Sequence, residues 1–347
     1  MSNIKGQTND TLIAICPLTF DRYMRIALSL ARRNLGQTWP NPAVGALLVK
    51  DGQIIAQGWT ARGGRPHAET EALGDAGDLA KGATLYVTLE PCTHHGKTPP
   101  CTDAIIKAGI ARCVIACRDP NPLVNGKGIE QLRNAGIEVI EDVCKNEAAA
   151  INCGFFFVIE KKRPYVALKL ATSRDGKIAG GEKRWITGEQ ARAYGHLLRS
   201  RHDAIATGIG TVLADDPLLT CRLPGLEDRS PVRVVFDRQE RLPRDSQLAK
   251  TADTIPVWVM AQPLPEALAA LAQKGITRLL VEAGQKLSTA FLLNGLIDRI
   301  YWFRAPIEIG EGGLSATSEA IDLAHWQRID HITLQPDTLD ILECSPA

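Results

Sequence analysis

Apolar and polar residues alternate along the N-terminal half in patterns that predict an α/β domain. Residues 21–34 carry apolar side chains at helical spacing, and residues 44–49 and 53–59 flank Asp51-Gly52 as the two arms of a β-hairpin. Further strands are predicted at 83–89, 111–117 and 137–140, and further helices from His67 onward and at 101–109 and 129–134. This order predicts a three-layer α/β/α arrangement.

The C-terminal half shows a second alternation. Strands are predicted from Pro164 and at 204–208, 232–237, 255–260, 278–282 and 299–303, and helices at 265–274 and 288–294, which together predict a mostly parallel α/β sheet. An apolar helix at 148–159 precedes Lys161-Lys162-Arg163-Pro164, a charged run that ends in proline and is typical of a linker. We therefore expect a flexible N-terminal extension at 1–16, one domain at 17–160 and another at 161–347.

Composition and charge narrow the class of protein. The chain has 347 residues, 45% of them hydrophobic, and 40 basic and 39 acidic residues leave a net charge of +1. Such a charge provides no strong field for nucleic acid or an anionic membrane. No apolar run approaches the roughly 20 residues that a membrane helix needs, and residues 1–10 lack the layout of a signal peptide. We expect a cytoplasmic homo-oligomer that binds neither nucleic acid nor membrane.

The motif with the most chemical content is His67-Ala-Glu69, followed by Pro91-Cys92 and, after eight more residues, Cys101. A catalytic zinc ion keeps three protein ligands and one open position, and one imidazole with two thiolates meets that need. Glu69 is then free to act as general acid and base. The pattern resembles the H-x-E and P-C-x-x-C signature of zinc nucleobase deaminases, with eight residues instead of two between the cysteines. We expect one Zn²⁺ per chain.

A closed zinc-ribbon site is the alternative, because His94 or His95 offers a fourth ligand. The chain has nine cysteines, and we expect those outside the motif to be reduced thiols. Among these, Cys113 and Cys117 are the candidates for additional zinc ligands. Both fall in a strand-like run, where residues four apart are too distant to share one metal easily.

The loop between the two motif cysteines extends the pattern. His94, His95 and Lys97 beside a metal suit a substrate that carries an anionic phosphate. With His67-Ala-Glu69, the run Pro-Cys-Thr-His-His-Gly-Lys-Thr-Pro-Pro-Cys resembles the deaminase half of the bifunctional riboflavin-biosynthesis deaminase/reductase family. The segments Trp39-Pro-Asn41-Pro42-Ala-Val-Gly45 and Asp119-Pro-Asn121-Pro resemble that family too. The resemblance implies substrate contacts from Asn41, His94, Lys97, Asp119 and Asn121, although a polar turn explains Asp119 and Asn121 equally simply.

The C-terminal half resembles the family's reductase domain, a relative of the dihydrofolate reductase fold. The resemblance begins with Pro164-Tyr-Val-Ala-Leu-Lys-Leu-Ala-Thr-Ser-Arg-Asp-Gly-Lys177 and continues in the family's order with Trp185-Ile-Thr187, Leu197-Leu-Arg199, Thr211-Val-Leu-Ala-Asp215-Asp-Pro-Leu-Leu219-Thr-Cys-Arg222 and Val281-Glu282-Ala-Gly284. No GxGxxG follows the first strand, so the Rossmann dinucleotide fingerprint is absent from this half.

The resemblance implies roles for these residues. NADPH contacts fall to Thr172, Trp185, Thr211 and Asp215, and substrate contacts to Lys169, Arg199, Leu219, Arg222 and Glu282. Two guanidinium forks suit a phosphate, and a carboxylate suits sugar hydroxyls. The cofactor pyrophosphate is expected at the helix start formed by Gly284, Gln285, Lys286, Leu287, Ser288, Thr289 and Ala290. Arg238 follows a strand and is expected to meet a 2′-phosphate, with Arg241 as a competitor.

Three departures from the family pattern cluster at the mouth of the reductase site. Arg174 stands where the family has Leu, the segment from Asp175 to Trp185 is about two residues shorter, and Lys183 stands where a substrate-binding Ser is common. We expect Lys183 to add a phosphate contact or to change the fit of the substrate.

The resemblance implies a three-layer α/β/α, cytidine-deaminase-like domain followed by a dihydrofolate-reductase-like α/β domain. The resemblance implies zinc-dependent hydrolytic deamination of 2,5-diamino-6-(5-phosphoribosylamino)pyrimidin-4-one, and then NADPH reduction of the ribosyl group to give 5-amino-6-(5-phosphoribitylamino)uracil. One alternative is a nucleobase or nucleoside deaminase with a non-catalytic C-terminal binding domain. The other is a non-enzymatic module that zinc stabilises.

Overall fold

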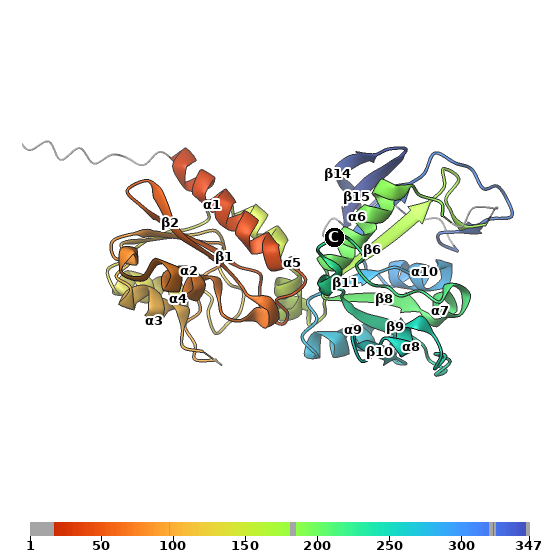
Figure 1. The fold of residues 1–347 in the computed structure, drawn as a ribbon, viewed down its shortest axis with the longest axis horizontal. Helices are drawn as coiled ribbons and strands as arrows, with labels where there is room; N and C mark the ends of the chain where they lie inside the picture. Colours follow the sequence, from red (N-terminus) through yellow and green to blue (C-terminus); the bar gives the residue numbers. More distant parts are fainter. Residues whose placement is uncertain (1–16, 97, 181–184, 319–321, 323, 345–347) are drawn as a thin grey trace, which may run out of the picture. The chain divides into compact units, whose positions relative to one another are not determined.

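The computed structural model describes residues 17–96, 98–180, 185–318, 322 and 324–344 (Figure 1). The chain divides into two compact units, which are described separately. The first comprises the chain up to Leu30 with Val44–Gly58 and Ala68–Ala148, and the second comprises Ala31–Ala43, Trp59–His67 and Ala149–Ala347. The second unit thus includes three segments that precede residue 161: residues 31–43, 59–67 and 149–160. A boundary between the two domains at residue 160 stays a prediction. The predicted extension at 1–16 lies outside the described residues.

The elements of the N-terminal half follow the predicted order. In chain order they are α1 (Pro17–Ala31), β1 (Gly45–Lys50), β2 (Gln53–Trp59), α2 (Ala68–Ala76), β3 (Thr84–Val87), α3 (Cys101–Lys107), β4 (Arg112–Ile115), α4 (Lys127–Asn134), β5 (Glu138–Ile140) and α5 (Lys145–Lys161), with 3-10 turns at Arg32–Asn34, Arg62–Gly64 and Gly77–Ala80.

The sheet of the first unit has the strand order β2-β1-β3-β4-β5, in which β1 and β3 are antiparallel and β3, β4 and β5 are parallel. Figure 1 shows α1 on one side of this sheet and α2, α3 and α4 on the other. Because β3 and β4 run in parallel, with Val87 beside Ile115, the segments that follow them leave the same edge of the sheet. This edge is where the motif residues gather.

The second unit contains the elements that follow α5. They are β6 (Tyr165–Thr172), β7 (Lys177–Ala179), α6 (Glu189–Ser200), β8 (Ala204–Gly208), α7 (Ile209–Asp215), β9 (Val232–Phe236), α8 (Gln247–Lys250), β10 (Val257–Met260), α9 (Leu264–Gln273), β11 (Arg278–Val281), α10 (Gln285–Leu293), β12 (Arg299–Arg304), β13 (Leu314–Ser315), β14 (Trp326–Leu334) and β15 (Asp337–Cys344), with a 3-10 turn at Glu227–Arg229.

The main sheet of this unit has eight strands in the order β10-β9-β8-β11-β6-β12-β15-β14. The first six are parallel, as predicted, and β15 and β14 add an antiparallel hairpin that the sequence reading missed. Apolar side chains of α9 and α10 cover one face, and those of α6, α7 and α8 cover the other. The carboxyl ends of the parallel strands therefore form one edge between two layers of helices, which is where ligands bind in open α/β sheets.

Among the described residues, no helix combines the length and the apolar content that crossing a membrane requires.

Candidate active sites

The predicted metal ligands come together at one edge of the first sheet. His67 lies directly before α2, Cys92 lies in the loop after β3, and Cys101 is the first residue of α3. Their ligand atoms all lie within 4.8 Å of one another. In the described part of the chain this group has three members, and His94 and His95 are exposed and do not belong to it. The arrangement matches an open site more closely than a closed zinc-ribbon site.

Close backbone contacts hold the ligand loops in place. A side chain at Gly58 of β2 would place its Cβ only 2.2 Å from the carbonyl oxygen of Ala68, so this glycine lets the first turn of α2 approach the strand. The amide of Cys101 donates to Sγ of Cys92 at 3.4 Å, and the amide and hydroxyl of Thr102 both donate to the Cys92 carbonyl at 3.2 Å. The first turn of α3 thus fixes both thiols.

The donor set fits a divalent cation such as zinc. The adjacent Cys92 side chain, burial and the charge of Glu69 raise the pKa of the Cys101 thiol. A cation at this point would reverse that effect, because it favours the thiolate form. Glu69 is 4% exposed and lies in the first turn of α2, two residues after His67. The structure therefore places a buried carboxylate beside the ligand group.

Glu90 is a residue that the sequence reading missed. Its buried carboxylate accepts hydrogen bonds from the amides of Gly126 at 3.0 Å and Gly128 at 2.9 Å, and from those of Asp119 and Ile129 at 3.3 Å. It caps α4 and ties this helix to the loop that carries Cys92. Its place immediately before Pro91-Cys92 was the available signal.

The other predicted deaminase residues occupy the loops around this group. Asn41 donates from Nδ2 to the carbonyl of Gly64 at 2.7 Å, in the loop just before His67. His94 is exposed, and Lys97 lies outside the described residues. Oδ1 of Asp119 accepts from the amide of Asn121 at 2.8 Å, and Oδ1 of Asn121 accepts from the amide of Leu123 at 3.1 Å.

Asp119 and Asn121 therefore shape a polar turn, while their proposed substrate role remains a prediction. Burial raises the pKa of Asp119 to about 6, opposed by its bond from Asn121 and assisted by the charges of Glu90 and Cys92. Asp119 is thus close enough to the predicted metal ligand Cys92 for their charges to interact, as expected for a residue of the deaminase site.

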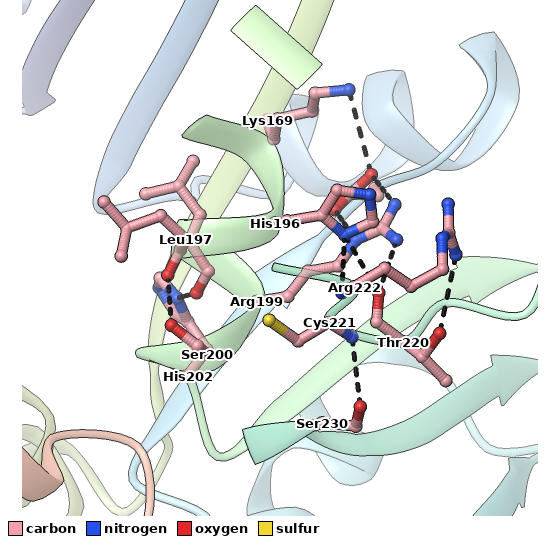
Figure 2. A network of polar contacts seen from close by, with 12 residues as sticks. Lys169, His196, Leu197, Arg199, Ser200, His202, Thr220, Cys221, Arg222 and Ser230 are labelled. Carbon is pink, nitrogen blue, oxygen red and sulfur yellow. Dashed lines mark hydrogen bonds and ion pairs between the residues drawn. The ribbon is translucent and has the colours of Figure 1, made fainter. Parts of the chain in front are cut away.

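The reductase half gathers four predicted substrate residues into one charged network (Figure 2). Nε and Nη2 of Arg199, in α6, donate to the two carboxylate oxygens of Glu282 at 2.8 and 2.9 Å, and Nζ of Lys169, in β6, lies 3.8 Å from the same carboxylate. Nη1 of Arg199 donates to the carbonyl of Thr220 at 2.9 Å. Arg222 lies two residues further on and is exposed, and its Nη1 donates to Oγ1 of Thr220 at 3.4 Å.

The network involves the two arginines differently. The fork of Arg199 is engaged with Glu282, and the phosphate contacts of Arg199 and Arg222 remain predictions. Arg222 thus has the more accessible guanidinium. Burial alone would raise the pKa of Glu282, but the charges of Arg199 and Lys169 lower it to about 2. Burial lowers the pKa of Lys169, with Glu282 opposing that effect.

Several predicted cofactor residues meet at the carboxyl ends of the strands. Gly284 precedes α10, and its amide donates to Oγ1 of Thr211 in α7 at 3.3 Å. Oγ1 of Thr172, at the end of β6, accepts from Nε1 of Trp302 at 3.0 Å. The first amides of a helix have no partner within the helix, so the start of α10 offers the amides of Gln285, Lys286 and Leu287 to an anion.

Later positions in α10 are less accessible. Ser288 and Thr289 are buried, and their hydroxyls donate to the carbonyls of Ala283 and Gln285. Their proposed cofactor contacts, and that of Ala290, remain predictions, as does the substrate contact of Leu219, whose side chain is buried.

The remaining predicted cofactor residues lie at the surface. Trp185 is 55% exposed, with the Arg192 guanidinium 5.6 Å from its ring, and Asp215 is exposed at the end of α7. Arg238 is exposed just beyond β9, and Lys183 lies outside the described residues. Within the described residues, Asp215 and Arg238 form no hydrogen bond or ion pair with Arg199 or Glu282.

His196 is a second residue that the sequence reading missed. It lies one turn before Arg199 on α6, and Nδ1 of its ring is 3.1 Å from the Thr220 carbonyl and 3.3 Å from the amide nitrogen of Arg222. The spacing of three residues from Arg199 was a signal that places both side chains on one helix face.

Known proteins resemble the chain over both halves. Residues 164–339 match the RibD C-terminal domain, and residues 19–117 match the cytidine and deoxycytidylate deaminase zinc-binding region. The riboflavin biosynthesis protein RibD of Aquifex aeolicus (strain VF5) is 46% identical, covering 84% of this chain and 88% of that protein.

Solved structures also resemble the chain over both halves. Acinetobacter baumannii RibD, form 1, has a TM-score of 0.88 at 39% identity and covers 95% of this chain and 100% of that one. A Thermotoga maritima structure described as a diaminohydroxyphosphoribosylaminopyrimidine deaminase/5-amino-6-(5-phosphoribosylamino)uracil reductase has a TM-score of 0.85 at 38% identity, with coverages of 94% and 99%.

These likenesses cover the deaminase and reductase halves alike, so they favour two activities over a deaminase with a non-catalytic C-terminal domain. They also confirm the predicted fold classes of the two domains. The chain belongs to the RibD family and is a bifunctional enzyme of riboflavin biosynthesis, with an N-terminal zinc-binding deaminase domain and a C-terminal reductase domain.

Proposed function

We propose that the enzyme first deaminates 2,5-diamino-6-(5-phosphoribosylamino)pyrimidin-4-one and then uses NADPH to reduce the ribosyl group of the product, giving 5-amino-6-(5-phosphoribitylamino)uracil. The observation that carries the first step is the group of His67, Cys92 and Cys101, with ligand atoms within 4.8 Å of one another, beside buried Glu69. The Thermotoga maritima relative, whose description names both activities, supports the substrate assignment.

In the deaminase site, His67, Cys92 and Cys101 would hold one zinc ion, which would supply the Lewis acidity that makes water a competent nucleophile near neutral pH. Water adds to the ring carbon that bears the 2-amino group. Glu69 carries one proton of this water to the ring nitrogen and the second proton, from the added hydroxyl, to the amino group, because an amine leaves only once it is protonated. Ammonia departs and a carbonyl remains.

In the reductase site, the nicotinamide supplies a hydride when NADPH is bound, and the protein orients the sugar and balances charge. Glu282 is held ionised by Arg199 and Lys169, so its carboxylate is ready to accept hydrogen bonds from ribosyl hydroxyls. Arg222 offers its exposed guanidinium to the phosphate. Bound NADPH would supply its hydride to the first carbon of the opened, imine form of the sugar, and the adjacent nitrogen would take up a proton from solvent.

The same edge of the sheet offers room for the cofactor. A cavity of about 450 Å³ opens beside Thr172, Trp302 and Arg304, at the ends of β6 and β12. The amides at the start of α10 are suited to the pyrophosphate. These two features support the proposed binding of NADPH along the strand ends.

Preference for NADPH over NADH rests on the end of β9. An acidic residue at a strand end often binds the ribose hydroxyls of NADH. Here Asp237 is fully buried, and its carboxylate accepts hydrogen bonds from the amides of Gln239, Arg241 and Leu242. Arg238, exposed beside it, is left to meet a 2′-phosphate.

Glu69→Gln tests the order of the two steps. With the diamino substrate, the wild-type enzyme should release ammonia and oxidise NADPH, and Glu69→Gln should do neither. With 5-amino-6-(5-phosphoribosylamino)uracil, Glu69→Gln should oxidise NADPH at the wild-type rate, which shows that the variant is folded. Glu71→Gln, an exposed change in the same helix, is the matched control.

Two outcomes would contradict the proposal. Ammonia release by Glu69→Gln at the wild-type rate removes Glu69 from the chemistry. Ammonia release by the wild type without NADPH oxidation rejects the proposed second step. A cytoplasmic location and a homo-oligomeric state also remain part of the proposal, to be measured by fractionation and by analytical ultracentrifugation.

A further inference from the structure

The loop that carries Arg222 has an irregular shape. Residues 216–222 lie outside the helices and strands. Leu219 has a φ of +55°, a conformation that residues other than glycine rarely adopt, and its side chain is buried in the core beneath α6. The amide of Cys221 donates to Oγ of Ser230 at 3.0 Å. Side-chain anchors, rather than a strand ladder, therefore set the path of this loop.

Helix α6 contributes two of these anchors from adjacent turns. Nη1 of Arg199 donates to the carbonyl of Thr220 at 2.9 Å. Nδ1 of His196 lies 3.1 Å from that same oxygen and 3.3 Å from the amide nitrogen of Arg222. Figure 2 shows the His196 ring beside Arg199 and close to the segment from Thr220 to Arg222. His196 thus contacts the loop on both sides of Cys221.

The chemistry of the ring decides which contact is a hydrogen bond. One ring nitrogen cannot both donate to Thr220 and accept from Arg222. The Thr220 carbonyl keeps Arg199 as a donor even when the imidazole does not donate to it, whereas among the described contacts the Arg222 amide gains a partner when Nδ1 accepts. Both groups therefore have a partner when Nδ1 is unprotonated and the hydrogen is on Nε2.

The surrounding charges keep the ring in this state. Burial and the guanidinium charges of Arg199 and Arg222 lower the pKa of His196 to about 4, while the Thr220 carbonyl and the Glu282 charge oppose that shift. Near neutral pH the imidazole is therefore uncharged, and Nδ1 retains the lone pair that accepts from the Arg222 amide.

We propose that His196 is a positioning residue of the reductase site, whose Nδ1 atom holds the loop from Thr220 to Arg222 so that Arg222 meets the substrate phosphate. This inference rests on the phosphate role proposed above for Arg222. Because the contacts of His196 are with the loop, its removal affects binding of the phosphorylated substrate more than hydride transfer.

The test uses the full-length enzyme, saturating NADPH and 5-amino-6-(5-phosphoribosylamino)uracil, so that the deaminase step is bypassed. Loss of the loop bond in His196→Ala should raise KM about 3- to 10-fold and change kcat by less than about 2-fold. His196→Asn, whose amide oxygen reaches the place of Nδ1, should restore most of the wild-type KM. His196→Gln fills a similar volume but carries its amide one bond further out, and should behave like His196→Ala.

A double-mutant comparison identifies the route of the effect. Arg222→Ala alone should raise KM about 10- to 100-fold, because it removes a charge-assisted bond. Adding His196→Ala to Arg222→Ala should raise KM no further, because the loop then has no guanidinium to position. Gln190→Ala, an exposed change in the same helix, should match the wild type.

The outcomes separate this inference from the function on which it rests. A raised KM in Arg222→Ala with an unchanged KM in His196→Ala overturns the inference and leaves the phosphate role standing. An unchanged KM in Arg222→Ala overturns both. Equal KM values for His196→Asn and His196→Gln, or a loss of kcat at unchanged KM, also overturn it, because neither result follows from an acceptor at Nδ1.

Discussion

Arg199→Met tests the ion pair between Arg199 and Glu282 in the reductase half. The side chains of Arg199 and Glu282 are 15% and 11% exposed, so the pair is largely shielded from water. The substitution keeps an apolar side chain of similar length but leaves the Glu282 carboxylate with Nζ of Lys169 at 3.8 Å as its nearest cation. Breaking a buried pair in this way costs about 3 to 5 kcal/mol.

The pKa of Glu282 provides an independent magnitude. Folding lowers it from 4.5 to about 2. A difference of about 2.5 units corresponds to about 3 kcal/mol of stability. Since the pKa is depressed in the folded state, this contribution is present in full above pH 4.5 and is lost as the pH falls from 4.5 through about 2. The advantage of the wild type over Arg199→Met should shrink accordingly.

Urea unfolding followed by tryptophan fluorescence measures the change in unfolding free energy of the second compact unit, which contains Arg199 and Glu282. All six tryptophans of the chain belong to the second compact unit: Trp39, Trp59, Trp185, Trp258, Trp302 and Trp326. We expect Arg199→Met to lose about 3 kcal/mol near neutral pH, and the loss to be about 1 kcal/mol smaller at about pH 3.5.

Arg201→Met, an exposed change at the end of the same helix, should stay within about 0.5 kcal/mol of the wild type at either pH. A loss for Arg199→Met below about 1 kcal/mol near neutral pH would refute the reasoning, because a shielded carboxylate would then need no partner. A loss of the same size at both pH values would show that packing, rather than charge, is its source.

Three further outcomes are expected. Cys101→Ser should lower the zinc content measured by atomic absorption and abolish ammonia release. NADPH oxidation with the deaminated substrate should persist. A zinc content equal to that of the wild type would remove Cys101 from the ligand set. Arg238→Ala should weaken NADPH binding about 10- to 100-fold in calorimetric titrations while NADH binding stays constant, and unchanged NADPH affinity would dismiss its 2′-phosphate role. Gly128→Ala places a Cβ 2.3 Å from the Pro91 carbonyl oxygen and should destabilise the first unit by about 1 to 3 kcal/mol, measured by circular dichroism. Gly74→Ala, with nothing within 4 Å, should instead be neutral or stabilising by up to about 1 kcal/mol, and equal losses for the two would refute the contact.

Periodicity alone was sufficient for most of the fold. Each parallel strand of the second unit was predicted within a few residues because its apolar side chains face helices on both sides and form short continuous runs, as in Leu279 and Leu280 of β11. The strand β14 was missed for the opposite reason. Most of its nine residues are exposed on both faces, so no apolar period marks it, and only its pairing with β15 makes it a strand.

The metal ligands were also predicted from the sequence alone. His67, Cys92 and Cys101 carry chemistry that few other residue types can supply, and their motif lies within one part of the chain. The structure adds that their ligand atoms converge within 4.8 Å. It also adds the carboxylate of Glu90, whose partners are amides more than thirty residues away, so its place before Pro91-Cys92 does not by itself show what it binds.

The sequence by itself determined the order of the parallel strands, the predicted ligand set and the list of charged residues in the reductase half. Only the tertiary structure decided how those charges are used. Arg199 and Glu282 are 83 residues apart, and the sequence does not show that the arginine fork is engaged with this carboxylate or that His196 faces the loop of Arg222. Hydrogen bonds have short range and strict geometry, so their partners are set only when packing brings distant segments together.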